Sequence, residues 1–282
     1  MSKIIDAHQH FWKIDVQEQS WRTSAHAAID KDYLPSSLEK NLNTCDISGT
    51  VLMQSVDSEK ENDRLFDFAR VASFVKGVVA WLPLKDAVAA KKELARISNG
   101  KNLCGVRTLI AKDNLDWLTS NASIELFRQI SDMNLAWDVV PITDLQIEAV
   151  KKLAKLVPDL RIMIDHMGKP PVDSGQWQPW ARNIEELSGN SNVAIKISVG
   201  IDVLTAWSEW NKNELEKYVH HVLRNFGPDR SLLASNWPVV LLKNTYENSW
   251  RDLVALLTSF GLSEQDLSKV MGGSATKWYG LS

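Results

Sequence analysis

Two histidines, His8 and His10, stand two residues apart at the end of an apolar run, in the segment DAHQH. Because side chains alternate along a β-strand, we expect both imidazoles to point to the same face. Two imidazoles on one face can bind a single divalent cation or a single anionic group. A third histidine, His166, ends another apolar run, before the segment MGKP. We therefore expect the three histidines to meet at one end of the fold.

Two cationic side chains interrupt apolar runs, namely Arg107 in CGVRTLI and Lys196 in VAIKIS. A cation among apolar residues needs an anionic partner or a polar cavity, because its transfer out of water is costly. The alternative is that each side chain covers an end of the core and extends its charge into solvent. Both interpretations stay open for Arg107 and for Lys196 at this point.

Eight short apolar runs rich in β-branched residues recur along the chain, and most precede a segment with helical periodicity. Continuous apolar runs are typical of strands that are buried on both faces, as in a parallel sheet. The runs are IIDAH from residue 4, TVLMQS from 50, GVVAWLP from 77, CGVRTLI from 104, AWDVVP from 136, RIMIDH from 161, VAIKIS from 193 and LLASNW from 232. Together they predict an α/β protein with a single (β/α)8 TIM-like barrel domain over residues 1–282.

Helical periodicity is clearest over residues 145–157, 215–226 and 250–260. We expect the apolar faces of these helices to pack on the sheet. Three further histidines lie outside the strands, with His26 in a loop and His220 and His221 on the second of these helices. We interpret them as solvated surface residues.

The two longest connections, residues 11–33 and 200–212, follow the first and the seventh strand. In a barrel, the loops that follow the strands form the face on which active sites are built. Four tryptophans in these connections are placed to shape the mouth of a pocket, namely Trp12, Trp21, Trp207 and Trp210. We assign Trp12 to substrate binding; the alternative is that these tryptophans cover small hydrophobic clusters of the loops themselves.

The composition excludes several classes of protein. A formal charge of -3, from 32 Lys and Arg against 35 Asp and Glu, offers no basic patch for nucleic acid or for an anionic membrane. Charged residues or prolines interrupt every apolar stretch before it reaches the length of a membrane span. The first residues lead directly into a strand-like run and the 2 cysteines are too few for a disulfide framework, so we expect a cytoplasmic protein. The expected partner is a small-molecule substrate, and a homo-oligomer stays open.

Seven motifs, in order, resemble those of the amidohydrolase-related lactonases, the family that includes L-fuconolactonase and L-rhamnonolactonase. They are DAHQHFW from residue 6, GVR from 105, DHMGKPP from 165, KIS from 196, FGPDR from 226, SNWPV from 235 and GGSATKWYGL from 272. The resemblance covers residues 6–281 and implies a barrel of the amidohydrolase superfamily type.

The resemblance implies hydrolysis of the lactone ring of a sugar acid, such as a fucono- or rhamnonolactone, to the open-chain acid. On the matching positions His8, His10 and His166 would surround the reacting carbonyl, and Arg107 would hold a hydroxyl or carboxylate of the substrate. For such a substrate we expect Lys196 and Gln54 to contact hydroxyls or a carboxylate as well. Ring opening needs a base that activates water, together with donors or positive charge at the developing oxyanion. Trp237, which follows the eighth run, is expected to stack on a sugar ring.

Asn236 departs from the family's pattern, in which an aspartate stands in the segment SDWP. An amide accepts no proton at neutral pH and is a poorer metal ligand than a carboxylate, so the departure removes both functions. Three explanations stay open. A histidine takes the proton in a natural subgroup while Asn236 orients water, an original aspartate has been replaced deliberately, or the protein binds without hydrolysing.

The three histidines also suit one divalent cation. Three neutral imidazoles resemble a zinc site with an open fourth position, at which bound water becomes more acidic. We therefore take His8, His10 and His166 as candidate zinc ligands, with metal-independent catalysis as the alternative because the family includes such members. Two other functions stay open. One is a lactone isomerase, in which a substrate hydroxyl replaces water, and the other is a sugar-acid binding protein, which Asn236 favours.

Overall fold

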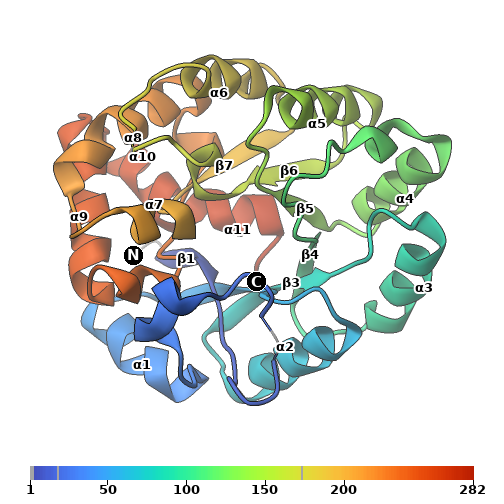
Figure 1. Cartoon of the computed structure of the whole chain (residues 1–282), viewed down its shortest axis with the longest axis horizontal. Coiled ribbons are helices and arrows are strands. Elements are labelled where there is room, and N and C mark those ends of the chain that lie inside the picture. The colour runs from blue at the N-terminus through green and yellow to red at the C-terminus, as the bar shows by residue number, and fades with distance from the viewer. Residues whose placement is uncertain (1–2, 18, 173) are drawn as a thin grey trace.

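The computed structural model describes residues 3–17, 19–172 and 174–282, and its strands form one barrel (Figure 1). The strands are β1 (Ile5–Gln9), β2 (Gly49–Met53), β3 (Val75–Trp81), β4 (Leu103–Arg107), β5 (Ala136–Val139), β6 (Arg161–Ile164), β7 (Val193–Ile197) and β8 (Ser231–Leu233). Each pairs in parallel with its neighbour in the chain, from β1 to β8. The eight predicted strands are confirmed.

The barrel closes where β1 meets the end of β8. A parallel bridge joins Gln9 to Trp237, and the His10 N–H donates to the Trp237 carbonyl at 2.7 Å. The Asn236 N–H donates to the His8 carbonyl at 2.9 Å. These bonds bring His8, His10 and Asn236 to the same point of the rim.

Helices surround the strands (Figure 1). They are α1 (Pro35–Thr44), α2 (Glu59–Val71), α3 (Ala87–Ile97), α4 (Asn121–Asp132), α5 (Asp144–Leu156), α6 (Trp180–Ser188), α7 (Ile201–Ala206), α8 (Lys212–Phe226), α9 (Tyr246–Ser259), α10 (Glu264–Ser268) and α11 (Ser274–Tyr279). The three helices expected from periodicity correspond to α5, α8 and α9. At the start of α5, the Thr143 hydroxyl accepts a hydrogen bond from the Gln146 N–H, which satisfies a free donor of the first turn.

The inside of the barrel is packed with small and apolar side chains. The strands contribute Ile5, Ala7, Val51, Met53, Val79, Cys104, Ala136, Met163, Ala194, Leu232 and Ala234. From α11, which crosses the centre of the view in Figure 1, Trp278 and Tyr279 join this cluster at the end where the strands begin. Because these side chains close the end where the strands begin, we look for functional groups at the opposite end, where the strands finish.

The two long connections meet at that opposite end. The first contains a short 3-10 helix, Ser24–Ile29, and the second contains α7. Nε2 of His26 lies 3.3 Å from Thr205 Oγ1, which joins the first connection to α7. No helix in the described ranges is both long enough and apolar enough to cross a membrane.

Candidate active site

The end of β1 positions His8 and His10 through a local irregularity. The register between β1 and β2 shifts between Asp6 and Gln9. An irregularity of this kind changes the usual alternation of side chains along a strand. The neighbours Ala7 and His8 therefore both face the inside of the barrel, where Ala7 joins the apolar cluster and His8 contacts Lys196. The Nε2 atoms of His8 and His10 lie 3.1 Å apart, as expected for imidazoles on one face.

His166 follows β6 in a tight turn, Asp165–Gly168, instead of an extended strand. Its φ of 51° is uncommon for a residue with a side chain, and such conformations cluster at functional sites. Its Nδ1 lies 2.8 Å from Ser198 Oγ, and its ring centroid lies 4.5 Å from that of His8. The structure thus brings the three histidines together, while their catalytic roles stay predictions.

Asp165 is a central anion of the site that the sequence analysis did not single out. Its buried carboxylate lies 2.9 Å from Lys196 Nζ, 3.2 Å from Arg107 Nε and 3.3 Å from His8 Nδ1. Burial alone would raise the pKa of Asp165, but Lys196, His8 and Arg107 outweigh burial and hold it well below the ordinary value. The sequence feature that could have identified Asp165 is its position directly before His166. Strand alternation would send these neighbours to opposite faces, and the turn removes that separation.

Lys196 lies on the floor of the site with no exposed surface. Its ammonium group is 2.5 Å from Asp138 Oδ1, and the Tyr279 hydroxyl donates to the same oxygen at 2.6 Å. Burial raises the pKa of Asp138 to about 6, while Lys196 acts in the opposite direction. Of the arrangements considered for Lys196, the structure thus shows anionic partners and not a charge that extends into solvent. Its contact with a substrate stays a prediction.

Burial favours the neutral form of the three imidazoles of the site. Burial is the largest cause, and it lowers the pKa of His10 and of His166 to about 3 and that of His8 well below the ordinary value. Nearby Arg107 lowers the pKa values of His10 and His166 further. Each neutral ring keeps a lone pair that can accept a proton or hold a metal ion.

Asn236 adopts the left-handed conformation, with a φ of 56°, which asparagine tolerates better than most residues. Its Nδ2 donates to the Val199 carbonyl at 2.8 Å. Its Oδ1 is buried and has no hydrogen-bond partner among the described residues. Because an unpaired buried acceptor is costly, a hydroxyl group of water or of a substrate suits this position.

Few of the candidate side chains are accessible from outside. His10 keeps 6% of its surface exposed, and Arg107 and His166 keep 7% each. Gln54 is fully buried. Its side-chain amide donates to Asp57 at 2.7 Å, and its backbone carbonyl accepts from Arg107 at 3.2 Å. A molecule that enters this end therefore meets His10, Arg107 and His166 before the other candidates.

Trp12 and Trp237 pack in the core, with exposed fractions of 0% and 1%. Both rings lie edge-on to Tyr33, at centroid distances of 5.5 and 5.2 Å. Trp207 and Trp210 pack edge-on at 5.8 Å in the other connection. These contacts favour the alternative that the tryptophans cover hydrophobic clusters of the loops, and a contact of Trp12 or Trp237 with substrate stays a prediction.

The interpretation of the remaining histidines as solvated is wrong for two of them. His26 is only 7% exposed and His221 only 8%. His26 is covered by α7, and His221 Nε2 lies 3.0 Å from the Ala181 carbonyl, with its ring against Trp180. Packing between helices and loops buries these rings, which a loop position or a helical stripe does not reveal.

One group of side chains in the described ranges could hold a metal ion, and it consists of His8, Asp165 and His166. One ligand atom from each residue lies within 4.8 Å of the others, and all three residues are buried. Neutral imidazoles and an ionised carboxylate are donors typical of zinc, so these residues fit a divalent cation. The group differs from the three histidines expected, because Asp165 stands in it in place of His10.

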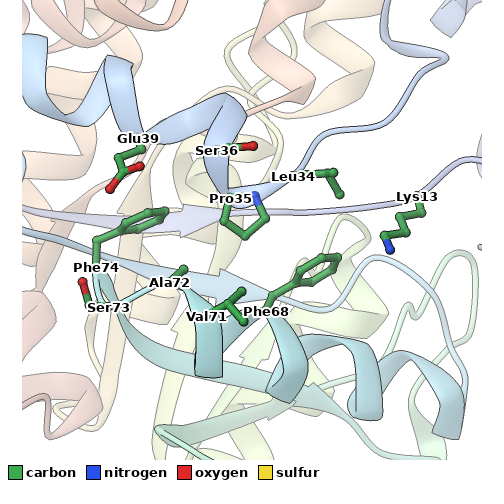
Figure 2. Close-up of a pocket in the computed structure, with 10 residues that line it drawn as sticks. All are labelled: Lys13, Leu34, Pro35, Ser36, Glu39, Phe68, Val71, Ala72, Ser73 and Phe74. Atoms are coloured by element: carbon green, nitrogen blue, oxygen red, sulfur yellow. The ribbon is translucent and has the colours of Figure 1, made fainter.

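A cavity lies away from this site, between the start of α1 and the end of α2 (Figure 2). Its walls include Pro35, Phe68 and Phe74, with Lys13 and Glu39 on different sides of the opening. None of its lining residues is a candidate site residue. The cavity is therefore separate from the candidate active site.

A parallel barrel whose strands end in clustered histidines, an ionised aspartate and an arginine defines a hydrolase-type enzyme of the amidohydrolase kind. The chain matches the Amidohydrolase family over residues 5–281 and belongs to it. It is 30% identical to an L-fucono-1,5-lactonase of Burkholderia ambifaria, over 99% of this chain and 96% of that protein.

Solved structures share the fold. Two crystal structures of an amidohydrolase from Burkholderia multivorans, one with bound HEPES and one with bound zinc, superpose with TM-scores of 0.89 and 0.88. Both are 22% identical to this chain and are covered over their full length. The predicted (β/α)8 barrel of the amidohydrolase type is confirmed.

Proposed function

We propose that the protein hydrolyses the lactone ring of a sugar acid, such as a fucono- or rhamnonolactone. The observation that carries the proposal is the convergence of His8, His10 and His166 with Arg107 and Asn236 at the carboxyl ends of the strands. Similarity to an L-fucono-1,5-lactonase over nearly the whole chain supports it.

His166 is the residue that we assign as the base. Its Nδ1 contacts Ser198 Oγ, whereas its Nε2 has no hydrogen-bond partner among the described residues. With the proton on Nδ1, Nε2 carries the lone pair that accepts a proton from the attacking water. A lowered pKa makes the resulting imidazolium a strong acid, which passes the proton to the ring oxygen as the carbon–oxygen bond breaks.

Arg107 and Asn236 complete the reaction site in this proposal. Arg107 Nε pairs with Asp165 and Nη1 donates to the Gln54 carbonyl, each at 3.2 Å. The remaining N–H groups of Arg107 are available to the carbonyl oxygen that becomes an oxyanion. The free Oδ1 of Asn236 accepts a hydrogen bond from the attacking water and orients it without taking its proton.

A zinc ion would be held by His8, Asp165 and His166 and would act as a Lewis acid on the lactone carbonyl. The zinc in the Burkholderia multivorans amidohydrolase supports this choice of metal. His166 cannot hold an ion and accept a proton through the same nitrogen, so the route through His166 is proposed for protein without metal.

A panel of aldonolactones assayed by proton release tests the proposal. We expect acid release from at least one lactone and loss of this activity in His166→Gln, with His220→Gln as a control outside the barrel. Chromatography separates hydrolysis from isomerisation, because isomerisation conserves total lactone. No rate above buffer for any lactone, together with an equally inactive Asn236→Asp variant, would contradict the proposal.

A second candidate function is binding of a sugar acid without turnover. The amide of Asn236, at the position where the family's pattern has a carboxylate, favours it. A ligand-dependent rise in melting temperature without acid release would support this function. Turnover that depends on His166 would exclude it.

We also propose that residues 1–282 form a single domain. Strand pairing runs without interruption from β1 to β8, and the two ends meet at Gln9 and Trp237. A single cooperative transition in scanning calorimetry is the expected result, and two separable transitions would contradict it.

A further inference from the structure

Lys196 places a positive charge directly beneath His8. Its ammonium lies 2.5 Å from Asp138 Oδ1, 2.9 Å from Asp165 Oδ1 and 3.2 Å from His8 Nδ1. An ammonium ion has three protons to donate and no lone pair with which to accept. Its contacts therefore determine in which direction a hydrogen bond at His8 Nδ1 runs.

The proton on His10 is located by its neighbour. Nδ1 of His10 lies 3.0 Å from the Met53 carbonyl oxygen, which can only accept, so Nδ1 carries the proton. Nε2 of His10 then has a lone pair, and Nε2 of His8 lies 3.1 Å from it. Two lone pairs at this distance would repel, so a proton or a cation must lie between them.

The groups around His8 distinguish two positions for its proton. If Nδ1 accepts from Lys196, Nε2 carries the proton and donates it to His10, so that each of these nitrogens has a partner. If Nδ1 instead donates to Asp165 at 3.3 Å, its proton also faces the ammonium of Lys196. The two Nε2 lone pairs then confront each other, which suits a bound cation.

We propose that Lys196 is a positioning residue that keeps the His8 proton on Nε2 and thereby weakens the binding of a divalent cation between Nε2 of His8 and Nε2 of His10. For His8 to bind a cation through Nε2, its proton must move to Nδ1, where Asp165 accepts it, and no proton is released. In this position of the cation, Asp165 orients a ligand and is not itself a ligand, in contrast to an ion held by His8, Asp165 and His166. Lys196 opposes this change because it occupies Nδ1 and adds repulsion toward the cation. This role of Lys196 concerns a bound cation and not the lactone, so it does not depend on lactone hydrolysis.

The zinc affinity of a Lys196→Met variant tests the proposal. We expect its zinc Kd to be about 10- to 100-fold lower than that of the wild type, the scale on which partners of a ligand alter metal affinity. The double variant Lys196→Met, Asp138→Asn removes both charges of the pair and is expected to show the same gain if the single variant folds poorly. Competition with a chromophoric chelator gives the Kd, and the melting temperature reports folding.

Lys169→Met is the matched control. Lys169 pairs with Asp202 at 2.5 Å near His166, so this variant removes one positive charge close to the site without changing the contacts of His8. We expect its zinc Kd to stay within about 3-fold of the wild type, since that charge is partly exposed and screened. A gain equal to that of Lys196→Met would overturn the positioning role.

Nitrogen-15 NMR of the histidine rings adds a readout that a merely structural role would not move. In zinc-free protein we expect the His8 proton on Nε2 in the wild type and on Nδ1 in Lys196→Met. Protonated Nδ1 in the zinc-free wild type would overturn the proposal. So would a zinc Kd that is unchanged or higher in both Lys196 variants.

Discussion

Two groups of histidines in this protein are similarly shielded from solvent and differ in what surrounds them. His8, His10 and His166 meet one another beside an ionised Asp165 at the end of the barrel. His26 and His221 pack against hydroxyl, carbonyl and aromatic groups between helices and loops. Burial alone therefore does not distinguish the two groups of histidines, whereas the buried charged groups beside His8, His10 and His166 do.

Replacing one histidine from each group gives the largest expected contrast. His166→Gln should lower kcat/KM by about 10²- to 10⁴-fold, the usual effect of losing a general base. His221→Gln should keep the rate and lose about 1 kcal/mol of unfolding free energy with its hydrogen bond. Initial rates and urea denaturation of both variants measure the difference, and a similar loss of rate in both would break the comparison.

Arg107 tests whether the charges beside the histidines act on the reaction. Arg107→Lys keeps a positive charge but loses the planar set of donors. We expect kcat/KM to fall by about 100-fold, as when an oxyanion donor is removed. An unchanged rate would show that Arg107 only pairs with Asp165.

Asn236→Asp tests proton transfer at the site that the barrel histidines form. A carboxylate at this position can accept a proton from water, so we expect kcat to rise by about 10-fold, a modest general-base contribution. Steady-state kinetics on the best lactone measures the change. A lower rate would contradict the view that the amide limits proton transfer.

The pH dependence of stability tests the barrel histidines without a substrate. His10 and His166 have pKa values of about 3 in the folded protein, against 6.5 for a free histidine. Between these values the unfolded chain binds protons that the folded protein does not, so stability falls as the pH drops below about 6.5. Each group contributes at most about 1.4 kcal/mol per pH unit.

Denaturation over a series of pH values measures this loss. A double variant, His10→Gln with His166→Gln, should lose stability less steeply on acidification than the wild type. Parallel curves for the two proteins would show that these rings do not carry the effect.

The strands could be predicted because each is buried on both faces and forms a continuous apolar run. The same rule left Asp138 unnoticed inside AWDVVP, since its partner Lys196 lies 58 residues away and no local pattern links them. Trp12 shows a further limit. Its place in a loop favoured an exposed pocket residue, whereas contacts with Trp21 and Tyr33 bury it.

By itself the sequence determined the barrel, its family and the set of histidines at its rim, because periodicity and motif order are local properties of the chain. The tertiary structure alone decided which charges meet. Asp165 and His8 are 157 residues apart, and they make contact only through barrel closure, the bulge in β1 and the turn at His166. The barrel closure, the bulge in β1 and the turn at His166 depend on packing between strands that are distant in the sequence. They bring charged residues into one buried network, whereas the local sequence around each residue indicates only a strand that contains a charged residue.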